Sequence, residues 1–119
     1  MSVKHSKNVL HEKVGAGEKT ERQVLIGPGE GPNFAMRRFI MQPGGSMPRH
    51  KNTVEHEQYV LRGRARIGIG GETHEVSAGD VVYIPAGTPH FYEVLSTDEP
   101  FEFLCMIPNT PEDRVEILE

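Results

Sequence analysis

Short runs of alternating apolar and polar residues, separated by glycines and prolines, limit the folds open to this chain. Its 119 residues include 13 glycines and 9 prolines, many of which stand between the runs. Alternation with a period of two is typical of a strand with one buried face. Repetition of such runs with turns between them indicates an all-β sandwich or barrel, and the length fits one domain. We therefore expect a single all-β domain with little helix.

The strand-like runs can be located along the chain. They span residues 34–42, 56–69 with a break at Gly63, 81–84, 90–95 and 101–107. The first run should end at Pro43, because this proline and the two glycines after it favour a turn. Residues 81–84 are almost continuously apolar, which indicates burial on both faces. Residues 1–20 are weakly patterned and predict an N-terminal arm or edge strand, so that the barrel domain would span residues 21–119.

Composition and charge exclude several classes of protein. The net charge is −4 and the isoelectric point is about 5.9, so no excess of positive charge suggests a nucleic-acid partner. No apolar run is long enough for a membrane helix, and the N-terminus lacks the apolar core of a signal peptide. A single cysteine, Cys105, excludes an internal disulfide and favours a reducing compartment. We expect a cytoplasmic protein that binds neither nucleic acid nor a membrane.

Three histidines stand within the glycine-rich stretches and could share one site. His50 and His56 lie between Gly44 and Gly63, and His90 follows a second stretch that begins at Gly79. Imidazole is the commonest metal-binding side chain. Three converging imidazoles can hold a divalent ion and leave coordination positions free for a substrate.

The period-two alternation predicts which side chains share the barrel interior with these histidines. If His56 points inward, Gln58 and Val60 do so as well, and an inward His90 brings Tyr92 with it. In the last strand an outward Glu102 leaves a set of apolar or weakly polar residues facing inward. That set contains Phe101, Phe103, Cys105 and Ile107.

The two glycine-rich stretches resemble the two motifs of the cupin superfamily. In the first stretch His56 stands where the motif has Glu, and Asn52 stands where it has a second His. In the second stretch Val94 replaces the motif's Asn. The remaining motif positions match, and they are Gly44, His50, Gly63, Gly79, Pro85, Gly87 and His90.

The resemblance covers roughly residues 34–107 and implies a jelly-roll barrel, also called a double-stranded β-helix, that is commonly a homodimer. A His at the Glu position is similar to the small single-domain cupins with an all-histidine site. The implied ligands of one divalent transition metal (Mn, Fe, Ni, Cu or Zn) are His50, His56 and His90, with Asn52 or water beside them. An alternative register would make Glu57 the ligand and turn His56 outward. Only one of the two can bind the metal, because adjacent strand residues cannot both face it. The spacing to Gly63 favours His56.

The expected site suits a small anionic or oxygen-chelating ligand, because three neutral imidazoles leave the charge of the ion uncompensated. We expect an enzyme that acts on a small organic acid or diketone, by dioxygenase-like or isomerase-like chemistry, with Tyr92, Cys105 and Gln58 orienting the substrate. The alternative is a non-catalytic protein that binds or senses a metal-anchored metabolite. The expected pocket walls are Arg37, Met47, Val60, Phe101, Phe103 and Ile107.

Arg37 and its neighbour Arg38 are adjacent on a strand, so one should face inward and one outward. An inward arginine would be an anchor for a carboxylate. Alternatively, both guanidinium groups reach solvent.

Overall fold

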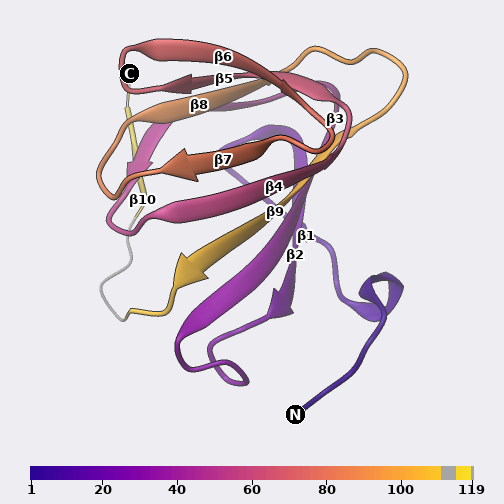
Figure 1. The fold of residues 1–119 in the computed structure, drawn as a ribbon. Coiled ribbons are helices and arrows are strands. Elements are labelled where there is room, and N and C mark those ends of the chain that lie inside the picture. Colours follow the sequence, from indigo (N-terminus) through magenta and orange to yellow (C-terminus); the bar gives the residue numbers. More distant parts are fainter. Residues whose placement is uncertain (111–114, 119) are drawn as a thin grey trace.

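The fold is a single strongly curved antiparallel sheet, seen in a computed structural model that describes residues 1–110 and 115–118 (Figure 1). Within these residues the only helix is a short 3₁₀ turn at Ser6–Asn8, which agrees with the all-β prediction. No helix in this part of the chain is long and apolar enough to cross a bilayer. The strands are β1 (Glu12–Lys13), β2 (Glu18–Ile26), β3 (Phe34–Asn52), β4 (His56–Arg62), β5 (Arg64–Ile69), β6 (Glu72–Ser77), β7 (Val81–Ile84), β8 (His90–Val94), β9 (Phe101–Pro108) and β10 (Val115–Ile117).

The long strand β3 joins the two halves of the sheet. Its first half pairs with β2 and β9, and its second half pairs with β8 and β10. The prediction that this strand ends at Pro43 is wrong, because the chain bends there and continues. Gly44 has φ +83°, and a Cβ on Gly45 would lie 2.7 Å from the Gln42 carbonyl oxygen. The two glycines thus form a bend that lets one strand serve both halves of the barrel.

The predicted break at Gly63 is present between β4 and β5. Gly63 has φ +81°, and a Cβ there would meet the Pro100 carbonyl and lie 2.8 Å from Phe101 Cα. Only glycine allows both this dihedral angle and this close approach of the chain. Because of this break the two strands have different partners: β4 pairs with β9 and β7, whereas β5 pairs with β6 and β8.

The inward-facing residues form one continuous core, as the alternation predicts. His56, Gln58 and Val60 are buried on β4. The aromatic core centres on Phe103, whose ring stacks on Phe39 at 5.1 Å and on Tyr92 at 5.3 Å. The inward strand residues thus enclose a space whose walls are aromatic and aliphatic.

One expectation about burial is wrong, and one outward-facing residue is more buried than its position suggests. Residues 81–84 are not buried on both faces, because Val81 is 76% exposed and Tyr83 is 57% exposed. They lie on the outer face of β7, which is the last strand in the order of the sheet. Glu102 does face away from the interior, but it is only 5% exposed because Arg38 and Arg62 from the neighbouring strands form ion pairs with it there.

The N-terminal segment runs beside the barrel and is partly strand. β2 begins at Glu18, inside the segment predicted as an arm, and β1 pairs with it. Between these strands the chain turns at Val14 and Gly17, where the Gly17 amide donates to the Val14 carbonyl. The division of the chain at residue 20 stays a prediction.

Candidate functional site

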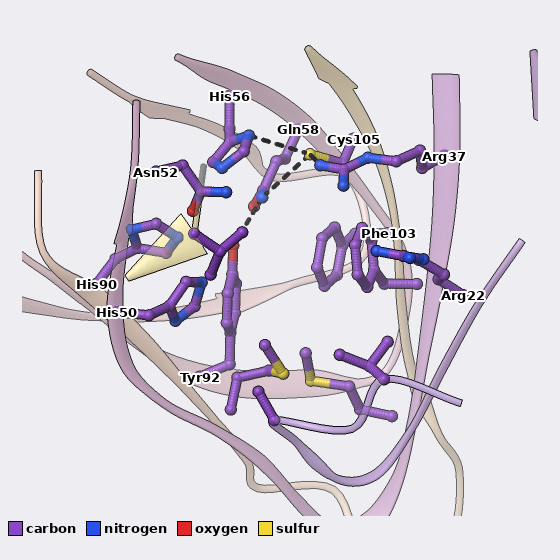
Figure 2. A pocket seen from close by; sticks show the side chains of 16 residues that line it. Arg22, Arg37, His50, Asn52, His56, Gln58, His90, Tyr92, Phe103 and Cys105 are labelled. Atoms are coloured by element: carbon purple, nitrogen blue, oxygen red, sulfur yellow. Dashed lines mark hydrogen bonds between the residues drawn. The ribbon is translucent and has the colours of Figure 1, made fainter. Parts of the chain in front are cut away.

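A cavity of about 230 Å³ lies inside the barrel. Its walls come from β2, β3, β4, β8, β9 and β10 and from the chain between β1 and β2 (Figure 2). No aspartate or glutamate is among the described residues that line it, which are Val14, Ala16, Arg22, Arg37, Phe39, Met41, Met47, His50, Asn52, His56, Gln58, His90, Tyr92, Phe103, Cys105 and Val115.

The three motif histidines come together at one side of this cavity (Figure 2). His50 lies near the end of β3 and pairs with His90 at the start of β8, while His56 begins β4. The ring centres of His50 and His90 are 4.1 Å apart, and those of His56 and His90 are 5.5 Å apart. All three side chains are buried. Glu57 lies on the opposite face of β4, so His56 is the one of the two that reaches the cavity.

Hydrogen bonds fix the tautomer of two of these rings. His50 Nδ1 lies 2.7 Å from the Pro48 carbonyl oxygen, and His90 Nδ1 lies 2.9 Å from the Thr88 carbonyl oxygen. A carbonyl only accepts, so each Nδ1 carries the hydrogen, and the Nε2 lone pair of the neutral ring is free. Such outer hydrogen bonds are the usual way in which a protein orients imidazole ligands of a metal.

Burial keeps the rings neutral. Desolvation lowers the pKa of His56 to about 3, and the positive charges of Arg37, His90 and His50 contribute further. Desolvation also lowers the pKa of His90 to about 4, against the opposing effect of its bond to Thr88. The pKa of His50 falls for the same reason. Neutral imidazoles are the form that binds a metal, because a proton and a metal compete for the same lone pair.

We expect these histidines to make the metal-free protein sensitive to acid. In the unfolded chain they take up protons below about pH 6.5, whereas the folded rings of His56 and His90 resist protonation until about pH 3–4. Their stabilising contribution is therefore complete above pH 6.5 and is lost as the pH falls. By linkage the loss is at most roughly 2 kcal/mol per histidine between pH 6.5 and pH 5. Denaturant titrations in the presence of a chelator measure it.

The control for this acid effect is an exposed histidine. His74→Gln should keep the pH dependence of the wild type, because His74 is on the surface. His56→Gln and His90→Gln should each flatten it. Equal slopes in all four proteins would contradict the assignment of acid sensitivity to the buried rings.

Asn52 adds an oxygen to the site. Its Oδ1 atom is buried and has no hydrogen-bond partner among the described residues. A buried carbonyl oxygen without a partner is costly, and a cation would satisfy it. In the described part of the chain, however, no three His, Cys, Asp or Glu side chains already have their donor atoms gathered around one point. The three rings are close together and neutral, but their donor atoms do not converge on one point.

A chain of polar contacts continues from the histidines across the cavity. Cys105 Sγ lies 3.7 Å from His56 Nδ1 and accepts from Arg37 Nη2 at 3.3 Å. Gln58 Nε2 donates to the Tyr92 hydroxyl oxygen at 2.6 Å. The three residues expected to orient a substrate, Tyr92, Cys105 and Gln58, therefore all line the cavity, and Gln58 contacts the other two.

Of the six residues expected to form the pocket wall, three are among the described residues that line the cavity. Arg37, Met47 and Phe103 line the cavity. Val60, Phe101 and Ile107 are buried but are not among the described residues that line it. Alternation predicts the face of a strand that a residue occupies, but not its depth along the barrel.

Other lining residues were missed from the sequence. Phe39 and Met41 share the inward face of β3 with Arg37, so the alternation contained a signal for them. Val14, Ala16 and Val115 come from segments outside the motifs and reach the cavity through tertiary packing alone. The sequence of these segments carries no local sign of that position.

Comparison with known proteins agrees with the fold and the motifs. Residues 37–107 match the family model described as Cupin domain. The polyketide cyclase RemF from Streptomyces resistomycificus has 32% identity and a TM-score of 0.85, over 100% of this chain and 87% of that one. The 1-methylthio-D-xylulose 5-phosphate methylsulfurylase of Rhodospirillum rubrum is 31% identical over 81% of this chain and 60% of its own length.

A third relative is the quercetin 2,3-dioxygenase of Bacillus subtilis, which is 31% identical over 67% of this chain and 24% of its own length. The match thus covers less than two thirds of the dioxygenase and of the methylsulfurylase. The family model, in contrast, covers more than half of this chain, and the jelly-roll barrel with its histidine-lined interior fits it. The chain is therefore a cupin, of the small cupin-2 type.

Proposed function

We propose that this cupin is a metal-dependent enzyme that acts on a small organic acid or diketone. His50, His56 and His90 would hold one divalent transition metal (Mn, Fe, Ni, Cu or Zn), and Asn52 Oδ1 or water would complete the protein side of the site. The observation that carries the proposal is the group of three buried, neutral imidazoles around one cavity, two of them with Nδ1 bound to a backbone carbonyl. The bound metal would supply Lewis-acid chemistry or dioxygen activation.

Tyr92 and Gln58 suit the orientation of a ligand oxygen. Gln58 donates to the Tyr92 oxygen, so the hydroxyl hydrogen of Tyr92 is left to donate to a ligand. Burial raises the pKa of Tyr92 well above its ordinary value, which keeps the hydroxyl protonated at neutral pH. Tyr92 would therefore act as a hydrogen-bond donor to a ligand oxygen and not as a base.

The charge of the cavity favours an anionic ligand. Two arginines and no carboxylate are among its described lining residues. With the histidines engaged as ligands, none of these side chains is suited to activate water as a general base. This composition supports oxygenation, isomerisation or a related Lewis-acid reaction over hydrolysis.

The relatives support an enzyme without selecting its reaction. They are named as a cyclase, a methylsulfurylase and a dioxygenase, which are three different chemistries. The same lack of a general base also favours a second candidate, a non-catalytic protein that binds or senses a metal-anchored metabolite. We further propose that the protein is cytoplasmic, on the ground of its single cysteine, and that it is a homodimer, as the family resemblance implies.

Metal analysis followed by turnover assays tests the proposal. Protein purified without added metal is analysed for its elements, and dioxygen uptake and substrate loss are then measured with 1,3-diketones, keto acids and thiols. We expect one metal ion per chain and multiple turnovers with at least one member of the panel. Tight binding of a panel member without turnover, whichever of the five metals is loaded, would replace the enzyme by the metabolite binder.

A further inference from the structure

One half-buried cation that lines the cavity has no anionic partner in the described part of the chain. Arg37 lies on the inner face of β3, and its Nε atom is buried without a hydrogen-bond partner. Its only hydrogen bond to a described residue runs from Nη2 to the sulfur of Cys105. A guanidinium carries five N–H donors, and leaving the buried Nε–H group without a partner is costly.

The other half-buried arginine of this strand, in contrast, is paired with a carboxylate. The neighbouring Arg38 faces the opposite side of the sheet and donates to Glu102 and to Gln23. Arg22, which also lines the cavity, forms an ion pair with Glu12, with 3.5 Å between Arg22 Nε and Glu12 Oε1. Of the two described arginines that line the cavity, Arg37 is the one without a carboxylate of a described residue beside it.

Neighbouring side chains hold Arg37 in place and leave its remaining donors open. The guanidinium carbon lies 5.0 Å from the ring centre of Phe39, so one face of the group is stacked on an aromatic wall. Cys105 contacts one of its nitrogens. A planar donor group that is fixed in this way is suited to bind a carboxylate through two parallel hydrogen bonds.

The distance between Arg37 and the histidines limits the size of a ligand that touches both. Cys105 Sγ lies 3.3 Å from Arg37 Nη2 and 3.7 Å from His56 Nδ1, so these two nitrogens are at most about 7 Å apart. In Figure 2 Arg37 lies on one side of Cys105 and Gln58, and the imidazole group lies on the other. A small ligand is therefore long enough to contact both Arg37 and the histidine side of the cavity.

We propose that Arg37 forms an anion subsite that binds the carboxylate of a short oxo acid, whose oxygen atoms at the other end reach the histidine side of the cavity. The contact with Arg37 stands on the geometry of the described residues, whereas chelation at the other end rests on the proposed function. The substrate class is thus narrowed to small acids that carry a carboxylate next to a chelating oxo group. Arg37 is the residue that distinguishes them from neutral diketones.

A matched pair of probes tests the subsite. 2,4-Dioxopentanoate and 2,4-pentanedione share the diketone head and differ by a carboxylate in place of a methyl group. With the metal-loaded protein, calorimetry should give roughly tenfold or greater tighter binding of the carboxylate probe, as expected for a charge-assisted hydrogen-bond pair. Arg37→Gln should abolish this preference, and Arg37→Lys should retain part of it, because a lysine keeps the charge but loses the fork.

The control variant is Arg66→Gln, which changes the net charge equally at an exposed ion pair with Glu93. It should keep the wild-type preference. Circular dichroism shows whether each variant is folded. If Arg37→Gln is not folded, the probes are compared in Arg37→Lys alone. A wild type that binds both probes equally, or a preference that survives in both folded Arg37 variants, would overturn the subsite.

The same titration on chelator-treated protein separates this inference from the proposed function. Without metal, binding of 2,4-pentanedione should be lost, and weaker binding of 2,4-dioxopentanoate should remain dependent on Arg37. If the protein takes up no metal while this dependence on Arg37 persists, the proposed function fails and the anion subsite stands. If the metal strengthens binding of both probes by the same factor and replacing Arg37 has no effect, the anion subsite fails and the proposed metal site stands.

Discussion

Replacing His56 with alanine is expected to reduce metal binding by at least about 100-fold. Loss of the groups that merely orient metal ligands already costs 10–100-fold in affinity, and His56 would be a ligand itself. The imidazole of His56 is neutral and lines the cavity, so the variant would leave two imidazoles and Asn52 as possible ligands. Elemental analysis after dialysis against a known free metal concentration measures the change.

The neighbouring residue supplies the control for this prediction. Glu57→Gln should bind metal as the wild type does, because Glu57 lies on the other face of β4. This pair of variants also decides the alternative register in which Glu57 would be the ligand. Full metal content in His56→Ala together with loss in Glu57→Gln would show that the register assigned to the site is wrong.

The largest loss of stability is expected for Phe103→Ala, at about 4 kcal/mol. Phe103 is 1% exposed, and its ring contacts those of Phe39, Tyr92 and Phe101 at 5.1–5.3 Å. Truncation of a buried phenylalanine removes its hydrophobic burial and leaves a cavity, which together cost about 3–5 kcal/mol. The free energy of unfolding from denaturant titration measures the effect.

An exposed aromatic residue is the matched control. Tyr83 is 57% exposed on the outer face of β7, and Tyr83→Ala should change the free energy of unfolding by no more than about 0.5 kcal/mol. A loss below about 1 kcal/mol for Phe103→Ala would mean that the aromatic wall of the cavity is not packed as described.

The positions of the site residues could be predicted from the sequence because strand alternation is a local property. Once His56 and His90 are placed inside, Gln58 and Tyr92 follow with the period of two. The break at Gly63 was equally local. The same rule also placed Glu102 on the outer face, and it failed only to show that Arg38 and Arg62 would cover that face.

What could not be predicted depends on distant segments. The bend at Gly44 looks like the end of a strand until β8 and β9 are known to flank the two halves of β3. The exposure of Val81 follows from the position of β7 at the end of the sheet order, which no local pattern encodes. The contribution of Val14 to the cavity likewise depends on where the N-terminal segment packs.

Anomalous diffraction from crystals of the metal-loaded protein shows whether the three histidines bind one metal ion. We expect one strong peak inside the barrel, within about 2.0–2.2 Å of one nitrogen from each of His50, His56 and His90. A peak beside the exposed His5, His11 or His74, or no peak in the barrel at full metal loading, would contradict it.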